Sequence, residues 1–261
     1  MDRTSIIGLL LGFIAIGVGM ILKGVDVAAL INPAAILIIL LGTTAAVIIA
    51  FPSSTIKTIP GLLKIIFTEQ KQTDNKELVR YFSELADLTR KEGLLSLEMK
   101  IPEADDPFTQ LGLQLVVDGH PSEYIRDLLL EKIEAMERRH EEGAAVFTQA
   151  GTYAPTLGVL GAVVGLIAAL ADMSDTDTLG YAISSAFVAT LLGIFTGYVM
   201  WHPFANKLRE KSKKEVMQKE MIVEGILSIT NGNSSRMVRE KLSSYLSTKE
   251  LIELEQEDQD A

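Results

Sequence analysis

Four long uncharged stretches restrict what this chain can fold into. They cover roughly residues 6–22, 33–51, 150–171 and 181–201, and none contains Asp, Glu, Lys, Arg or His. About 20 apolar residues can cross a bilayer as a helix. The first stretch is followed by the second rather than by a small-residue cleavage site, which favours a membrane helix over a secretory signal. We therefore expect an all-α membrane protein with four transmembrane helices and long cytosolic helical extensions.

The placement of Lys and Arg sets the expected orientation. Residues 52–149 hold 12 of the 24 and residues 202–261 hold 10, whereas the connection after the third span holds Asp172, Asp175 and Asp177 and no cation. Because Lys and Arg accumulate on the cytosolic side, both polar segments and both termini are expected there. The expected segments are 1–51 (transmembrane helices one and two), 52–149 (cytosolic helical domain), 150–201 (transmembrane helices three and four) and 202–261 (cytosolic C-terminal helices and acidic tail).

Capping and helix-breaking residues divide the polar segments into expected helices. Residues 56–67 alternate two lysines with apolar groups, which predicts a helix along the inner membrane surface. Thr73 or Asp74 caps one cytosolic helix, which Gly93 ends, and the unbroken pattern from Ser122 to Ala171 predicts a single helix of about 75 Å. The fourth span is expected to continue to Asn231. Further helices are expected over residues 107–119 and 236–246, and the acidic tail over 250–260 is expected to be frayed.

The third and fourth spans carry small residues at helical spacing. Gly158, Gly161 and Gly165 share one face of the third span, and Gly193 and Gly197 share one face of the fourth. Faces of this kind let helix backbones approach closely in lipid. Packing within one subunit explains any single glycine. Two such faces on adjacent spans favour a partner helix lodged between them.

Composition and motifs argue against several classes of function. The net charge of −10 disfavours nucleic acid as a partner, and the absence of Cys excludes disulfides and thiol chemistry. His120, His140 and His202 are scattered, and none has a second ligand at metal spacing. No phosphate-binding glycine loop or nucleophile motif is present. We expect neither an enzyme nor a metal or organic cofactor.

The uncharged spans also limit how this chain could move ions. Membrane proteins that do so normally place an ionisable group at depth, but the four spans offer hydroxyls only, Thr190 among them. A span threonine commonly bonds back to its own helix at i−4. Alternatively, Thr190 helps to solvate a cation or water beside a carboxylate from another chain. Either this chain conducts nothing, or a partner helix supplies the charge.

Three motifs, taken together, carry a family resemblance. They are TYAPTLGVLGAVVGLIAAL (152–170), AFVATLLGIFTGYVMWHPFANKL (186–208) and RKEGLLSLE (90–98). With the four spans and the large insert between the second and third, they resemble the MotA/PomA family of flagellar motor stator subunits over nearly the whole chain. The resemblance implies a homopentamer around a dimer of a single-span partner, MotB. The membrane aspartate of MotB would be the carboxylate missing here.

The resemblance also implies roles for residues of the spans. Pro155 and Pro203 match two family prolines of conformational coupling, and Pro155 is also assigned to the ion pathway. Thr190 matches the threonine near the partner's aspartate, and Tyr198 is a further hydroxyl of the pathway. Ala162 stands where sodium-driven relatives carry a threonine. Because a methyl group cannot coordinate a metal ion, the expected coupling ion is the proton and sodium is less favoured.

The third motif implies a contact with the rotor. Arg90 and Glu98 match the charged pair that meets the rotor protein FliG, with Lys91 as a basic accessory residue. A solvated helix surface is the alternative explanation. The expected function is a stator subunit of the bacterial cytoplasmic membrane that, with its partner, couples inward proton flow to torque in motility and chemotaxis. The alternatives are an ExbB/TolQ-like subunit that energises envelope transport, a sodium-driven stator, and a non-conducting scaffold.

Overall fold

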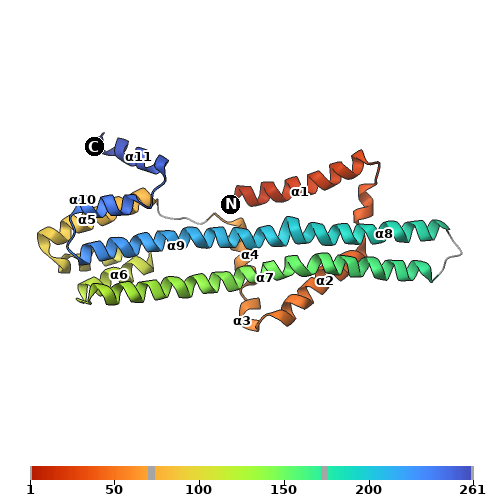
Figure 1. Ribbon diagram of the computed structural model, residues 1–261, viewed down its shortest axis with the longest axis horizontal. Helices are drawn as coiled ribbons and strands as arrows, with labels where there is room; N and C mark the ends of the chain where they lie inside the picture. Colours follow the sequence, from red (N-terminus) through yellow and green to blue (C-terminus); the bar gives the residue numbers. More distant parts are fainter. Residues whose placement is uncertain (1, 70–73, 172–175, 260–261) are drawn as a thin grey trace. The chain divides into compact units, whose positions relative to one another are not determined.

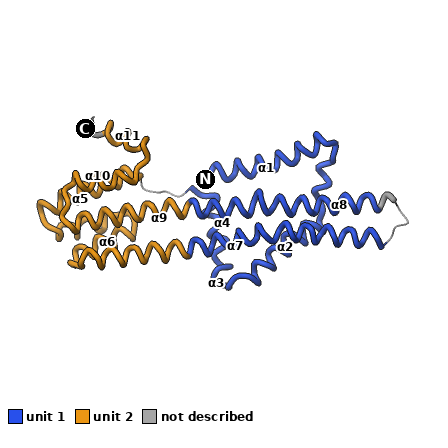
Figure 2. Tube along the Cα trace, viewed as in Figure 1, with its two compact units in different colours: residues 1–70, 139–210 blue, residues 71–138, 211–261 orange. Residues whose placement is uncertain are grey.

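The structure is a computed structural model that describes residues 2–69, 74–171 and 176–259. Every regular element within these residues is helical, as predicted (Figure 1). The chain divides into two compact units, which are described separately (Figure 2): unit 1 is residues 1–70 and 139–210, and unit 2 is residues 71–138 and 211–261. The expected segments 1–51 and 150–201 fall within unit 1, whereas 52–149 and 202–261 are each divided between the units. Asp172 and Asp175 lie outside the described residues.

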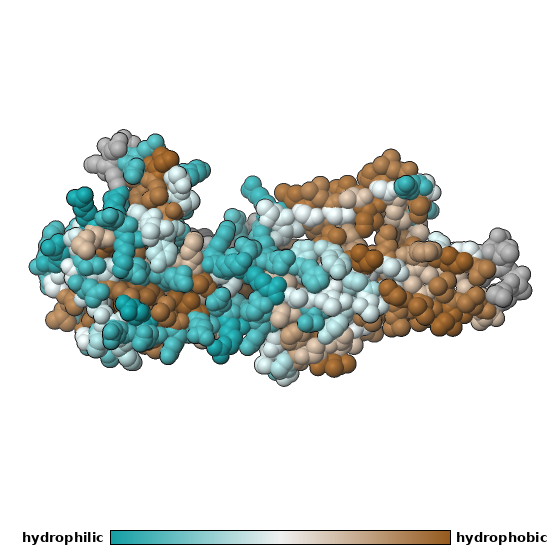
Figure 3. Space-filling view, viewed as in Figure 1, coloured by the Kyte–Doolittle hydropathy of each residue, from teal (hydrophilic) through white to brown (hydrophobic). Residues whose placement is uncertain are grey.

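Unit 1 contains the apolar parts of four helices that are long and apolar enough to cross a membrane. They belong to α1 (Arg3–Leu22), α2 (Pro33–Ala50), α7 (Ser122–Leu170) and α8 (Thr176–Phe195), which continues through the π-helical segment η4 (Thr196–Trp201). Asn32 accepts the Ala35 N–H and Pro33 occupies the first turn, which fixes the start of α2. Most large apolar side chains of α1 are exposed, and hydrophobic colours gather over these spans in Figure 3. Such a surface needs lipid or protein around it.

Two short helices follow α2, and the second of them packs against the beginning of α9 (His202–Thr230). They are α3 (Ser53–Ile56) and α4 (Ile59–Phe67). Ile66 of α4 is fully buried in a cluster with Phe147 and Phe204. The sequence predicts one helix over residues 56–67, and this is wrong in detail. Pro60 has no N–H to donate to the carbonyl of residue 56, so it starts a new helix instead.

Unit 2 has its own apolar core. It is built from α5 (Asn75–Glu92), the 3₁₀ segments η2 (Leu94–Met99) and η3 (Ile101–Glu103), α6 (Pro107–Val117), the first part of α7, the last part of α9, α10 (Ser235–Ser243) and α11 (Thr248–Gln259). The Asp74 side chain accepts the Lys76 N–H, and Gly93 ends α5 at φ +86°, as the caps predict. The α5 stripe including Phe82 is buried against side chains such as Leu113 and Ile226.

The acidic tail forms helix α11, so the expectation of a frayed end is wrong for residues 248–259. Leu254 is buried in the unit 2 core. The Lys76 ammonium lies 2.9 Å from a Glu253 carboxylate oxygen and 3.3 Å from one of Glu257, and Arg80 pairs with Glu257. The buried Leu254 side chain and the ion pairs with Lys76 and Arg80 of α5 therefore hold in place a segment whose acidic composition is typical of disorder.

The two long helices differ from each other in one respect. Helix α7 runs over residues 122–170 without interruption, as predicted. The fourth span also continues into the polar segment as predicted, but it passes through the π-helical turns of η4 before α9 begins. Both α7 and α9 contribute residues to both units.

Candidate functional site

Helices α7 and α8 meet at glycines. A Cβ atom built on Gly158 would lie 2.8 Å from the Ala189 carbonyl oxygen and 2.9 Å from the Gly193 Cα. One built on Gly193 would lie 2.8 Å from the Ala154 oxygen. In each case a glycine hydrogen points at a carbonyl of the other helix, a weak Cα–H···O contact common where helices cross closely. These glycines allow the two backbones to touch.

The two small-residue faces are therefore turned toward each other within one chain. Gly161 faces the Ala189 Cβ of α8 at 3.6 Å and Ile38 of α2 at 3.7 Å, measured from a built Cβ. This arrangement corrects the inference that a partner helix is lodged between the faces, because no space for one exists where backbones are in contact. Gly165 differs from the others in that nothing lies within 4 Å of its built Cβ. Its surroundings in this chain are open.

The two prolines of the sequence prediction flank the π-helical segment. Pro155 lies inside α7, where its missing N–H leaves the Gly151 carbonyl without the usual i+4 donor. A Cβ built on Gly197 of η4 would lie 2.8 Å from both this Gly151 oxygen and Pro155 Cγ. Pro155 therefore packs directly onto the π-helical segment, through the only residue type that leaves room for it.

The π-helical segment itself was not foreseen from the sequence. Its closing bond runs from the His202 N–H to the Gly197 carbonyl, five residues back. Pro203 directly follows and cannot donate to the carbonyl four residues before it. A proline directly behind a glycine-containing apolar helix was the available signal.

Several threonine hydroxyls of the spans are engaged locally as donors. Thr190 donates to the Ala186 carbonyl at 3.3 Å, and Thr152 and Thr156 bond back in the same i−4 manner. Thr190 thus shows the local bond that the sequence analysis left open as one alternative. The oxygen lone pairs of such a hydroxyl are still able to accept. Ala162 is half-buried on α7.

An aromatic pair lies at the end of the π-helical segment. The rings of Tyr198 and His202 have centroids 5.2 Å apart with planes inclined at 41°. Tyr198 is 64% exposed, whereas His202 is half-buried because its ring covers Gly151. A Cβ built on Gly151 would lie 2.7 Å from the His202 Cδ2. The sequence prediction included Tyr198 but gave His202 no role.

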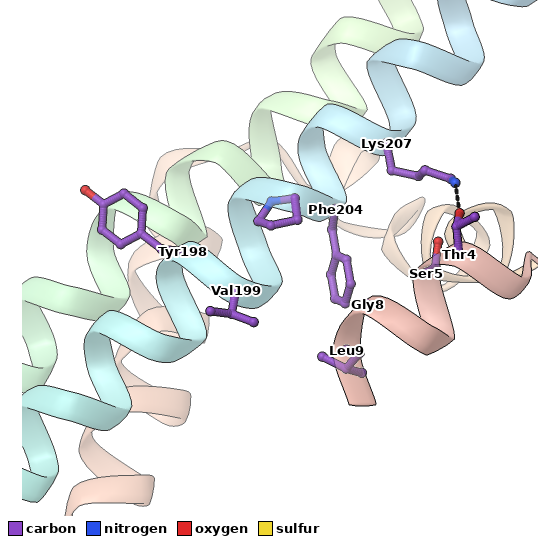
Figure 4. Close-up of a pocket in the computed structure, with 9 residues that line it drawn as sticks. Thr4, Ser5, Gly8, Leu9, Tyr198, Val199, Phe204 and Lys207 are labelled. Atoms are coloured by element: carbon purple, nitrogen blue, oxygen red, sulfur yellow. Dashed lines mark hydrogen bonds between the residues drawn. The ribbon is translucent and has the colours of Figure 1, made fainter. Parts of the chain in front are cut away.

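A cavity of about 390 Å³ lies on another side of the same segment (Figure 4). Val199 and Phe204 reach toward Gly8 and Leu9 of α1, while the Tyr198 ring projects away from Thr4 and Ser5 in this view. Lys207 donates to Thr4 at 2.8 Å and pairs with Asp2 at 2.8 Å, so its charge is balanced. Pro203 lines this cavity and is exposed.

The residues predicted to meet a rotor lie in unit 2. Arg90 and Lys91 are in the last turn of α5, Glu98 is in η2, and Gly93 separates the two elements. All three side chains are exposed, and within the described residues none makes a hydrogen bond or ion pair. They are therefore free to contact another molecule. The described residues also contain no group of three or more His, Cys, Asp or Glu placed to hold a metal ion.

Family comparisons cover almost the whole chain. Residues 100–221 match the MotA/TolQ/ExbB proton channel family, and residues 6–93 match the motility protein A N-terminal family. Motility protein A of Bacillus subtilis (strain 168) is 59% identical over 97% of this chain and 93% of that protein. Chemotaxis protein PomA of Vibrio alginolyticus is 31% identical over 98% of this chain and 100% of that protein. These relatives are named for motility and chemotaxis rather than for an enzymatic activity.

Solved structures agree with this assignment. The flagellar MotAB stator complex from Bacillus subtilis contains a chain that superposes with a TM-score of 0.92 at 58% identity, over 97% of this chain and 99% of that one. A chain of Campylobacter jejuni MotAB superposes with a TM-score of 0.91 at 30% identity, over 95% and 97% respectively. This chain thus belongs to the MotA family, the flagellar branch of the MotA/TolQ/ExbB proton channel proteins.

Proposed function

We propose that this chain is the multi-pass subunit of a flagellar stator in the bacterial cytoplasmic membrane, with both termini in the cytosol. The observation that carries the proposal is the full-length likeness to MotAB stator chains, together with spans that lack any ionisable group. Deleting the gene should abolish swimming while filaments still assemble. A deletion strain that swims but fails in nutrient uptake or envelope integrity would instead indicate the ExbB/TolQ-like function.

A single-span partner of the MotB type supplies the titrating carboxylate. Support comes from the names of the solved relatives, which are MotAB complexes, and from the cost of placing a charge in lipid, which restricts such groups to protein-lined sites. Several copies of this chain, five by family resemblance, would surround the partner. Co-expression with the partner should give ion flux in vesicles, and Asp→Asn at the partner's membrane aspartate should remove it. Flux from this chain alone would contradict the division of roles.

The coupling ion in this proposal is the proton. Ala162 offers a methyl group where sodium-driven relatives carry a hydroxyl, and methyl groups do not ligate metal ions. Swimming speed should stay constant when sodium in the medium is replaced by potassium, and it should fall when a protonophore collapses the proton gradient. Dependence of swimming speed on sodium would assign the chain to the sodium-driven class.

Arg90, Lys91 and Glu98 form the rotor contact, with FliG as the partner. Their exposure and lack of intramolecular pairing support this role, because exposed charges add little to stability but can steer a partner. Reversing Arg90 and Glu98 together (R90E/E98K) should abolish swimming while leaving the amount of assembled stator unchanged. The matched control is E134K/R138E, which reverses an exposed ion pair of α7 in the same unit. Loss of assembly, or equal loss in the control, would refute the assignment.

A further inference from the structure

We infer that His202 is the group on this chain that accepts the proton as it leaves the apolar spans and passes it to cytosolic water. The inference rests on the proposed proton coupling. It adds a residue to which the sequence prediction gave no role. Four observations carry it, concerning position, contacts, backbone and charge.

The first observation is the position of His202 in the sequence, directly after the fourth span. The spans from residue 150 to 171 and from 181 to 201 contain no Asp, Glu, Lys, Arg or His. Along the fourth span toward the polar segment, His202 is the first of these residues. Along α7 in the same direction, the stretch 143–149 also lacks them, and the next are Glu142 and Glu141. A proton that travels down this helix pair meets an imidazole before any carboxylate of this chain.

The contacts place the imidazole beside the predicted pathway residues. Its ring stacks on Tyr198 and covers Gly151, whose carbonyl is the one that Pro155 leaves without a helical donor. The Gly151 carbonyl is buried and faces Gly197 of η4, so the His202 ring lies where α7 and the π-helical segment meet. Within the described residues the His202 ring nitrogens make no hydrogen bond. Both nitrogens are therefore available for proton exchange.

The π-helical turn fixes which way the ring faces. One additional residue in a helical turn rotates all later side chains by about 100° around the helix axis. The register of η4 therefore sets His202 against α7 and directs Phe204 into the buried cluster with Ile66. π-helical turns occur frequently at functional sites, and this one ends beside an aromatic pair that includes an imidazole.

The charged groups of α9 near His202 are paired with carboxylates of other elements. The ionisable or charged groups on the elements around it include Tyr198 on η4, Tyr153, Glu141 and Glu142 on α7, and Lys207 and Arg209 on α9. Arg209 pairs with Glu141 at 2.7 Å and Lys207 pairs with Asp2 at 2.8 Å. In the transfer, an N–H bond forms on the neutral imidazole as the O–H bond of the partner's carboxylic acid breaks and leaves a carboxylate. Where a water molecule relays the proton, it gives one proton to the imidazole and takes one from the acid. Cytosolic water or buffer then removes the proton and restores the neutral ring.

The test uses the assembled motor with His202→Gln and His202→Asn, both of which keep a polar side chain but cannot titrate. Rotation at low load, where ion transfer limits speed, should fall about fivefold, a modest part of the about 10²–10⁴-fold that a positioned acid or base contributes. Stall torque at high load should stay near the wild-type value. The wild-type low-load speed should also fall as the cytosolic pH drops, and the variants should show a weaker dependence of speed on cytosolic pH.

The control and a rescue experiment separate proton transfer from packing. His120→Gln removes a histidine that stacks on Tyr124 at 4.9 Å in unit 2, and it should leave speed and pH profile unchanged. Imidazole added to cells carrying His202→Gly should restore part of the low-load speed. Variants with wild-type speed and pH profile would overturn the proposal, as would slow variants that imidazole does not rescue. A wild-type motor that ignores cytosolic pH and follows sodium would overturn the proton coupling on which the proposal rests.

Discussion

The glycines of the transmembrane spans differ in which atoms surround them and how closely those atoms approach. The sequence places Gly158, Gly161 and Gly165 on one helix face, yet their surroundings are unlike. Gly158 touches the backbone of α8, Gly161 faces side chains, and Gly165 has open space. A backbone atom cannot move aside as a flexible side chain can, so the cost of adding a methyl group should follow the nature of the neighbour.

We expect Gly158→Ala to destabilise the helix pair by about 1–3 kcal/mol, the range for overpacking a tight contact. Its new methyl group would meet the Ala189 carbonyl and the Gly193 Cα at under 3.0 Å. Gly165→Ala is the matched control in the same helix and should be close to neutral. Thermal unfolding of the detergent-purified chain, expressed without a partner, measures both. Equal effects would contradict the close approach of α7 and α8.

The sequence predicted some residues of the site and missed one, His202. Pro155 and Gly197, which the sequence analysis singled out separately, meet at η4, and Tyr198 lies in the same segment. His202 was missed because a histidine directly after an apolar run is indistinguishable from a surface residue until the π register turns it toward Gly151. That register depends on contacts between helices, which local sequence patterns do not encode.

Helix α11 is the element for which the acidic composition led to a wrong prediction, that of a frayed tail. Its attachment combines Leu254 in the core with ion pairs from α5. The hydrogen bonds from Lys76 hold the pKa of Glu253 below its ordinary value, and those from Arg80 and then Lys76 do the same for Glu257. A carboxylate whose pKa is lowered by folding stabilises the folded state above its unfolded pKa, and this contribution is lost as the pH falls through the folded pKa.

Acidification should therefore release α11 from α5. At neutral pH both carboxylates are ionised and the helix stays attached. As the pH falls from the ordinary value of 4.5 through the lowered pKa values, amide hydrogen exchange over residues 248–257 should accelerate before the core of unit 2 opens.

A substitution tests the same attachment at neutral pH. The Lys76 side chain is 13% exposed and pairs with Glu253. Lys76→Gln removes this ion pair and should accelerate amide hydrogen exchange in α11. Lys249→Gln is the matched control, because its ammonium is 3.6 Å from Glu253 on a side chain that is 87% exposed. Equal exchange in both variants would show that Leu254 alone anchors the helix.

The whole chain combines two units with separate apolar cores. Phe82 is fully buried in unit 2 and its ring contacts Gly225, whereas Ile66 is fully buried in unit 1. The four spans and most helix boundaries could be predicted because uncharged runs, caps and breakers are local signals. The division of α7 and α9 between the two units could not be predicted, because it depends on which segments far apart in the sequence pack together.

Phe82→Ala should lower the free energy of unfolding of unit 2 by about 3–5 kcal/mol, the usual cost of truncating a buried phenylalanine. Hydrogen exchange should then accelerate in α5, α6 and α10 while the apolar helices of unit 1 keep their protection. Ile66→Ala should produce the opposite pattern, with the loss of protection beginning in α4. A uniform loss of protection in either variant would mean that the shared helices unfold the two cores together.

The wide turn at residues 196–201 has a consequence for chain length. It accommodates one residue more than an α-helix would, so removing a single residue there would let the backbone close into ordinary α-helix without breaking its hydrogen-bond ladder. The chain would still be helical, but Phe204 and Leu208 would swing away from Ile66. A one-residue deletion at this point should therefore spare the helix and the insertion of the protein into membranes, and cost the chain its function.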